Sequence, residues 1–135
     1  MDEAVSSQVL DIVNESQKYA ILVTPYLALW GHAHQALSLA AIRGVKVTVI
    51  IRRGEWEPKV LQDIAWLTGN GIQVLAAEYL HAKIYLNEKS VFVSSMNLTE
   101  FSTKNSLEIG LTVRDEQAGR QVRDYVKDTL MKLAT

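Results

Sequence analysis

The chain lacks cysteine and contains only two prolines and three histidines among its 135 residues. Without cysteine it can form neither a disulfide framework nor a thiolate metal site. No apolar run approaches the ~20 residues that span a bilayer. The acidic, polar start MDEAVSSQ also differs from a secretory signal. We therefore expect a cytoplasmic protein without a membrane span.

The chain also lacks a surplus of positive charge. Its net charge is −1, whereas proteins that hold many phosphates usually carry a basic excess. A nucleic acid would have to be held by a local patch rather than by extensive wrapping. With 48% hydrophobic and 21% charged residues, the composition is that of a globular protein. Its length predicts a single domain over residues 1–135.

Helical and strand patterns alternate along the chain. We expect helices at residues 3–18 and 32–43, from Pro58 to about residue 68, and from about residue 115 to the end. The last helix should bury a stripe of Val122, Val126, Leu130 and Leu133, and the helix after Pro58 a stripe of Val60, Leu61, Ile64, Ala65 and Leu67. Strands are expected at residues 20–23, 45–51, 72–75 and 107–113, with a hairpin at 81–97. This order predicts an α/β fold, a three-layer α-β-α sandwich with a mixed β-sheet.

The stretch HAKIYLNEKSVFVSSMN, residues 81–97, holds the side chains best suited to chemistry. In a strand, His81 and Lys83 would point to the same face, because side chains alternate. The polar turn NEKS leads into a second apolar run, which ends at Ser94, Ser95 and Asn97. An imidazole, an ammonium, hydroxyls and a carboxamide would thus lie close together, a set suited to a phosphate ester.

This H-x-K followed by S-x-N resembles the single-motif branch of the phospholipase D superfamily, the phosphodiesterases and nucleases with an H-x-K-x4-D signature. His81, Lys83, Ser95 and Asn97 match that pattern, and Asn105 and Glu108 resemble its later Asn and Glu. The acidic position of the signature is Glu88 instead of Asp. It falls in the predicted turn, so we expect no chemical role for it.

The resemblance implies the same fold and a two-step hydrolysis of phosphodiesters. His81 would attack phosphorus and form a phosphohistidine, which water then releases. Lys83, Asn97 and Ser95 would neutralise the charge on the non-bridging oxygens, and Glu108 would orient the imidazole. Since Lys83 supplies the cation, the resemblance implies no metal and no cofactor. The expected activity is that of a metal-independent nuclease on DNA or RNA.

A single H-x-K provides only one of the two groups that in-line displacement needs. We therefore expect a homodimer in which His81 of each subunit faces one phosphorus across a twofold axis. The alternative is an intramolecular acid, His32 or His34, which should start the second helix near the same edge of the sheet. These two histidines can also be merely solvated or locally hydrogen-bonded.

Three further residues are candidates for substrate binding because they follow predicted strands, where ligands bind in open α/β sheets. They are Tyr26, Arg52 and Arg53. Ordinary loop packing of Tyr26 and solvation of the two arginines are the competing interpretations. Trp30 and Trp56, in predicted loops, are candidates for stacking or for a dimer contact.

Two other functions compete with a nuclease. The substrate could be a phospholipid or another small diester, although no Lys- and Arg-rich amphipathic stretch for membrane binding is present. Alternatively, the chain could be a non-catalytic phosphate-binding or dimerisation module with this fold.

Overall fold

The computed structural model describes residues 3–94 and 110–133. The helices are α1 (Glu3–Asn14), α2 (Gly31–Ile42), α3 (Pro58–Gly69), α5 (Glu116–Asp124), the π-helical segment η1 (Tyr125–Leu130) and α6 (Met131–Leu133). The strands are β1 (Tyr19–Thr24), β2 (Lys46–Arg52), β3 (Gln73–Ala77), β4 (Ile84–Asn87), β5 (Val91–Ser94) and β6 (Gly110–Val113). This order confirms the α/β class expected from the sequence.

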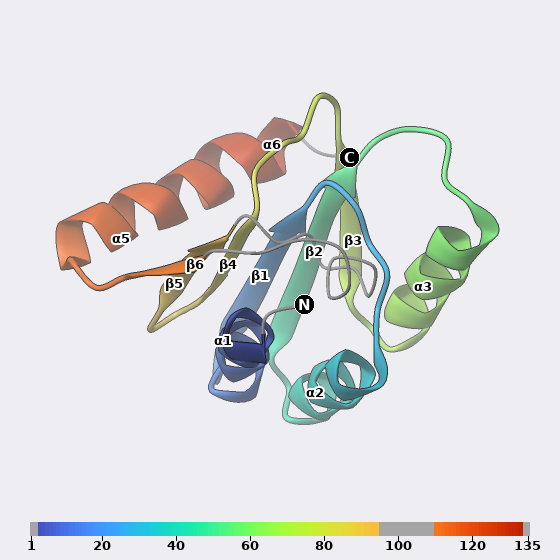
Figure 1. The fold of residues 1–135 in the computed structure, drawn as a ribbon, viewed down its shortest axis with the longest axis horizontal. Helices are drawn as coiled ribbons and strands as arrows, with labels where there is room; N and C mark the ends of the chain where they lie inside the picture. The colour runs from blue at the N-terminus through green and yellow to red at the C-terminus, as the bar shows by residue number, and fades with distance from the viewer. Residues whose placement is uncertain (1–2, 95–109, 134–135) are drawn as a thin grey trace.

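The six strands form one mixed sheet in the order β3-β2-β1-β4-β5-β6. The strands β1, β2 and β3 are parallel, whereas β4 pairs antiparallel with β1, and β5 and β6 continue antiparallel. Figure 1 shows α1, α2 and α3 on one side of this sheet and α5 with α6 on the other. The structure is therefore the three-layer sandwich with a mixed sheet that the alternating pattern predicts.

The face covered by α1, α2 and α3 holds the larger apolar core. Alternate residues of the strands point into it, including Leu22, Val49, Tyr85 and Phe92. Each large aliphatic side chain buried in this way contributes about 1.5–3 kcal/mol to folding. The chain leaves α2 and α3 through Gly44 and Gly71, both with positive φ (85° and 76°), as the glycines at these helix ends predict.

The opposite face is covered by the C-terminal helical segment. Val126 and Leu130 are buried there against Ile21, Ile50 and Leu86. Leu133, which the helical stripe places in the core, is instead 72% exposed. The π-helical stretch just before it makes wider turns than an α-helix, so the apolar stripe loses its phase after Leu130.

The apolar stripe expected for α3 is also partly wrong. Its buried residues are Asp63 and Leu67, while Leu61 is 51% exposed. A carboxylate takes a core position here because it has two partners, as described below. No helix within residues 3–94 and 110–133 is both long and apolar enough to cross a membrane.

Candidate active site

His81 and Lys83 lie at the start of β4, at the sheet edge where the parallel strands end. A turn at Glu78 and Tyr79 leads out of β3, and Tyr79 adopts a left-handed conformation with φ of 57°. Regular strand structure begins only at Ile84, three residues later than the sequence suggests, so the strand alternation expected to put His81 and Lys83 on one face does not reach His81. Ladder pairing nevertheless reaches Lys83, whose carbonyl accepts from the Ser94 amide (3.0 Å). The approach to the strand thus keeps Lys83 in place and leaves His81 exposed.

A row of polar residues crosses the sheet at this edge. The register pairs Val23 with Ile84 and Ile84 with Val93. One residue further along, the same register brings Thr24 and Ser94 to either side of Lys83. Because side chains alternate, all three belong to the face of Leu22, Tyr85 and Phe92. Thr24 and Ser94 are buried and Lys83 is half-buried, so Lys83 lies at the rim of the larger core.

Neither His81 nor Lys83 has a hydrogen-bond or ion-pair partner for its side chain among the described residues. The two groups are therefore available to a ligand as far as residues 3–94 and 110–133 are concerned. A hollow of about 440 Å³ adjoins His81 and is lined by Arg53, Tyr79, Tyr125 and Leu133, among others. Three of these, Tyr79, Tyr125 and Leu133, are large side chains at least half exposed. The imidazole thus lies beside an apolar lip, and the charged residues of the same lining are Arg53 and Glu78.

The structure brings together the three candidates for substrate binding. Tyr26, Arg52 and Arg53 line a second hollow, of about 410 Å³, together with Trp56. The Arg52 Nη1 lies 3.4 Å from the Tyr26 hydroxyl and donates to it. Arg53 also lines the hollow of His81, so its side chain lies between the two cavities. Its Nη2 donates to the Ala76 carbonyl (3.3 Å), which ties the guanidinium to β3.

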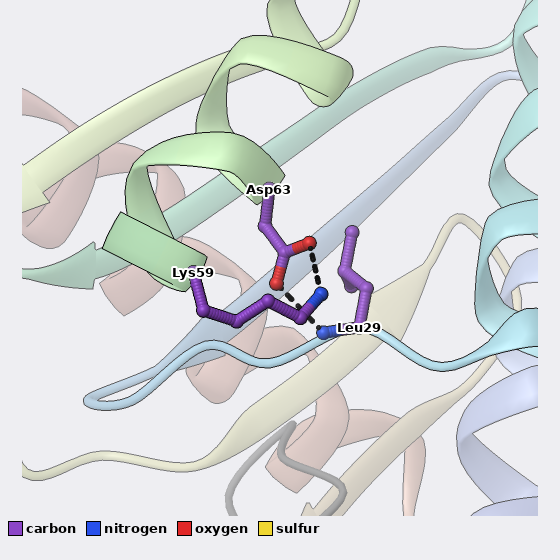
Figure 2. A network of polar contacts seen from close by, with 3 residues as sticks. All are labelled: Leu29, Lys59 and Asp63. Atoms are coloured by element: carbon purple, nitrogen blue, oxygen red, sulfur yellow. Dashed lines mark hydrogen bonds and ion pairs between the residues drawn. The ribbon is translucent and has the colours of Figure 1, made fainter. Parts of the chain in front are cut away.

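Asp63 is a buried charged residue that the sequence does not reveal as structurally important. Its carboxylate accepts from the Leu29 amide (3.0 Å) and from Lys59 Nζ (2.9 Å), as Figure 2 shows. The ion pair with Lys59 is an i,i+4 pair within α3, whereas Leu29 belongs to the connection between β1 and α2. Asp63 therefore fixes the loop that carries Tyr26. The Lys59-x3-Asp63 spacing is the sequence signal that could have indicated the pair.

Glu88, the acidic residue of the signature, has a structural role at the other end of β4. Its carboxylate accepts hydrogen bonds from the backbone amides of Gln17, Lys18 and Tyr19, at 3.0–3.2 Å. Burial raises the pKa of Glu88, but these hydrogen bonds outweigh it and hold the pKa below its ordinary value. Glu88 lies five positions after Lys83, about 16 Å in extended chain. The expectation that Glu88 takes no part in chemistry agrees with this position.

His32 and His34 do not lie near His81. The six residues 25–30 carry the chain from β1 to the start of α2 (Figure 1). His32 is placed beside Leu10 and Asn14 of α1. The His34 ring packs edge-on against Trp66 in the last part of α3, with 4.5 Å between ring centroids. The expectation that α2 begins at the active edge is wrong, because the long connection moves its first turn away.

The remaining predicted site residues, Ser95, Asn97 and Glu108, together with Asn105, lie outside the described residues. Their roles stay predictions from the sequence. Within the described ranges, no three His, Asp or Glu side chains gather as a metal site would require.

Comparisons with known proteins agree with this architecture. A family model described as cardiolipin synthase, PLD-like domain, matches residues 9–130. An uncharacterized protein of Streptococcus mutans serotype c is 27% identical over 129 residues, which are 90% of this chain. The chain spans only 28% of the length of that curated relative.

Two solved structures share the fold over nearly the whole chain. One is a phospholipase D family member, Nuc from Salmonella typhimurium, with a TM-score of 0.82 and 19% identity over 96% of this chain and 88% of that one. The other is NucT from Helicobacter pylori, with a TM-score of 0.81 and 16% identity over 98% of this chain and 91% of that one. At these identities the likeness establishes the fold.

Proposed function

Because the chain belongs to the phospholipase D-like domain family, we propose that it is a metal-independent phosphodiesterase that hydrolyses DNA or RNA. We infer that residues 1–135 act as one such domain. The observation that supports this most is the pair His81 and Lys83 at the carboxyl edge of the parallel strands. Both side chains lack a protein partner within the described residues, and Arg53 shares the adjoining hollow. A nucleophilic nitrogen and two fixed cations are the groups that an anionic diester requires.

The proposed reaction has two displacements. A ring nitrogen of His81 attacks phosphorus as the bond to the leaving oxygen breaks, and a general acid gives that oxygen a proton. Water then attacks the phosphohistidine, the P–N bond breaks, and the same group takes the proton of the water back. Lys83 stabilises the charge on the non-bridging oxygens, with Ser95 and Asn97 as further donors. Glu108 orients the His81 imidazole.

The general acid is proposed to be His81 of a second subunit. One subunit offers a single His81, and the other two histidines lie beside α1 and against Trp66. A twofold axis passing close to His81 would bring two copies to one phosphorus. The exposed side chains around it, Tyr79, Tyr125 and Leu133, supply apolar area that such an interface could cover.

A subunit-mixing experiment tests the shared site. Wild-type and His81→Asn subunits are mixed in known ratios, dissociated in denaturant, and refolded together. Hydrolysis of bis(p-nitrophenyl) phosphate is then measured in EDTA. If each site needs two His81 side chains, activity follows the square of the wild-type fraction, about a quarter at equal amounts. Activity that falls in direct proportion to that fraction would contradict the shared site.

A phospholipid or another small diester is the second candidate substrate. The apolar lip of Tyr79, Tyr125 and Leu133 beside His81 favours it, since an acyl chain or a membrane surface could contact these side chains. Single-stranded and duplex oligonucleotides and anionic phospholipid vesicles are compared as substrates under the same metal-free conditions. Cleavage of lipid alone would select this candidate. Binding of phosphate without turnover of any diester would indicate a non-catalytic module.

A further inference from the structure

The hollow between the β1–α2 and β2–α3 connections has a composition that the hydrolysis of a phosphodiester does not by itself require. Two aromatic side chains line it, Tyr26 and Trp56, over an aliphatic floor that includes Leu27, Ile51 and Val60. Tyr26 is 56% exposed, although aromatic rings of this size are usually more buried. An open hollow with aromatic walls favours a flat ring as its occupant.

The charges around this hollow cancel. Arg52 and Arg53 line it together with Glu55 and Glu57. A free phosphate would meet repulsion from the two carboxylates, and a choline-like cation would meet repulsion from the two guanidinium groups. An uncharged ring with both hydrogen-bond donors and acceptors meets neither penalty. Nucleobases are such rings, and carboxylates can accept from their ring N–H or exocyclic amino groups.

The walls of the hollow are held in place before any ligand arrives. The Trp56 indole Nε1 donates to the Arg52 carbonyl (3.0 Å), and the ring packs against the larger core. The Arg52 amide donates to the Pro25 carbonyl (3.3 Å), and Asp63 fixes Leu29 in the same connection as Tyr26. A preformed site loses less conformational entropy when it binds.

The hollow adjoins the reaction centre through Arg53, which lines both cavities. We propose that the Tyr26–Trp56 hollow is a nucleobase subsite, which holds the base next to the phosphate attacked by His81 while Arg53 contacts the connecting backbone. This inference rests on the proposed phosphodiesterase function and narrows its substrate to single-stranded nucleic acid. A base can enter such a hollow only when it is out of the helical stack, which costs least in a single strand.

Binding of short oligomers tests the subsite separately from catalysis. The probes are fluorescein-labelled hexathymidylate and an abasic hexamer with the same number of phosphates, bound to the His81→Asn protein in EDTA at low salt. We expect the thymidylate strand to bind about 5- to 150-fold more tightly than the abasic strand, the range given by one stacked base. A stable duplex should bind no better than an abasic strand with the same number of phosphates.

Three substitutions locate the effect within the hollow. Tyr26→Ala and Trp56→Ala should remove the preference for the strand with bases, whereas Tyr26→Phe keeps the ring and should retain it. Leu61→Ala, an exposed change on α3 outside the hollow, serves as the matched control. Thermal unfolding of each variant excludes loss of the fold. Tyr26 is the decisive position because its side chain is exposed and its removal leaves the core intact.

Equal affinity for the two hexamers, or an equal fall in both after Tyr26→Ala, would overturn the subsite. Displacement of the hexamer by phosphocholine at a lower concentration than by thymidine monophosphate would overturn it in favour of a lipid headgroup. Turnover of bis(p-nitrophenyl) phosphate by the wild-type protein is measured in parallel. If turnover is absent while the base preference persists, the phosphodiesterase proposal fails and the binding of bases stands. If turnover is present without a base preference, the nucleobase subsite fails and the phosphodiesterase proposal stands.

Discussion

Both ends of the β4–β5 hairpin carry polar residues of the H-x-K signature. The side chains at the turn end have hydrogen-bond partners in the protein, whereas those at the open end have none among residues 3–94 and 110–133. At the turn end, the Glu88 carboxylate accepts from three backbone amides, and the Nδ2 of the buried Asn87 side chain donates to the Ile12 carbonyl (2.8 Å). At the open end, His81 and Lys83 have no side-chain partner within the described residues. Polar groups that hold the fold together are paired, and groups that await a ligand are left unpaired. The spacing of a motif alone does not separate these two roles.

The largest effect should come from the open end. We expect His81→Ala to lower kcat for bis(p-nitrophenyl) phosphate by about 10³-fold or more, as loss of a nucleophile does. Because His81 is exposed, the melting temperature should change little. Steady-state kinetics and thermal unfolding measure the two quantities. His32→Ala is the control and should keep near-wild-type activity, since that side chain lies beside α1. If His32→Ala lowers kcat and His81→Ala does not, the proposed site is wrong.

A smaller loss of activity is expected when the positive charge of Lys83 is removed. Lys83→Met should lower kcat by about 10²-fold, because the ammonium stabilises charge that develops in the transition state. Lys89→Met changes a lysine at the turn end of the same hairpin and should leave kcat unaltered. The measurement is kcat and KM of both variants with the same diester. A raised KM with an unchanged kcat after Lys83→Met would restrict this residue to ground-state binding.

The turn end should affect stability instead of activity. Glu88→Gln keeps the shape of the side chain but removes the charge that accepts from Gln17, Lys18 and Tyr19. The free energy of unfolding should fall by about 1.5–3 kcal/mol, the range for hydrogen bonds to a charged group. Activity per folded molecule should be retained. Urea unfolding gives the first quantity, with the exposed Glu15→Gln as control. A loss of turnover without a loss of stability would make Glu88 part of the site.

The smallest effect should be the pH dependence of the stability that the Glu88 carboxylate contributes. Since the folded pKa of Glu88 lies below its ordinary value of 4.5, its stabilisation is present above that value. It is lost as the pH falls through the lower, folded pKa. The difference in melting temperature between wild type and Glu88→Gln should therefore narrow from pH 6 towards pH 3. A difference that stays constant over this interval would mean that the ionised carboxylate is not what stabilises the turn.

Much of the architecture could be predicted from residue patterns, because apolar residues recur at regular spacings in its helices and strands. The β-branched runs at β1 and β2 and the glycines after α2 and α3 specify elements that the structure contains within a few residues. The pair His81 and Lys83 could be located because the H-x-K followed by S-x-N resembles a family signature. The patterns could not predict the burial of Asp63, which depends on the Leu29 amide 34 residues away. Nor could they place His32, since the course of a six-residue connection is decided by tertiary contacts.

The widened turn at Tyr125–Leu130 has a consequence for the cavity beside His81. It re-phases the end of the chain by a fraction of a turn, so that Leu133 projects outward and, with Tyr125, forms one wall of that cavity. We expect that deleting one residue from this stretch restores regular α-helical winding and withdraws Leu133 from the wall, while every residue of the H-x-K segment is unchanged. The shape of the cavity beside His81 thus depends on the number of residues in a helix far along the chain, as well as on which residues they are.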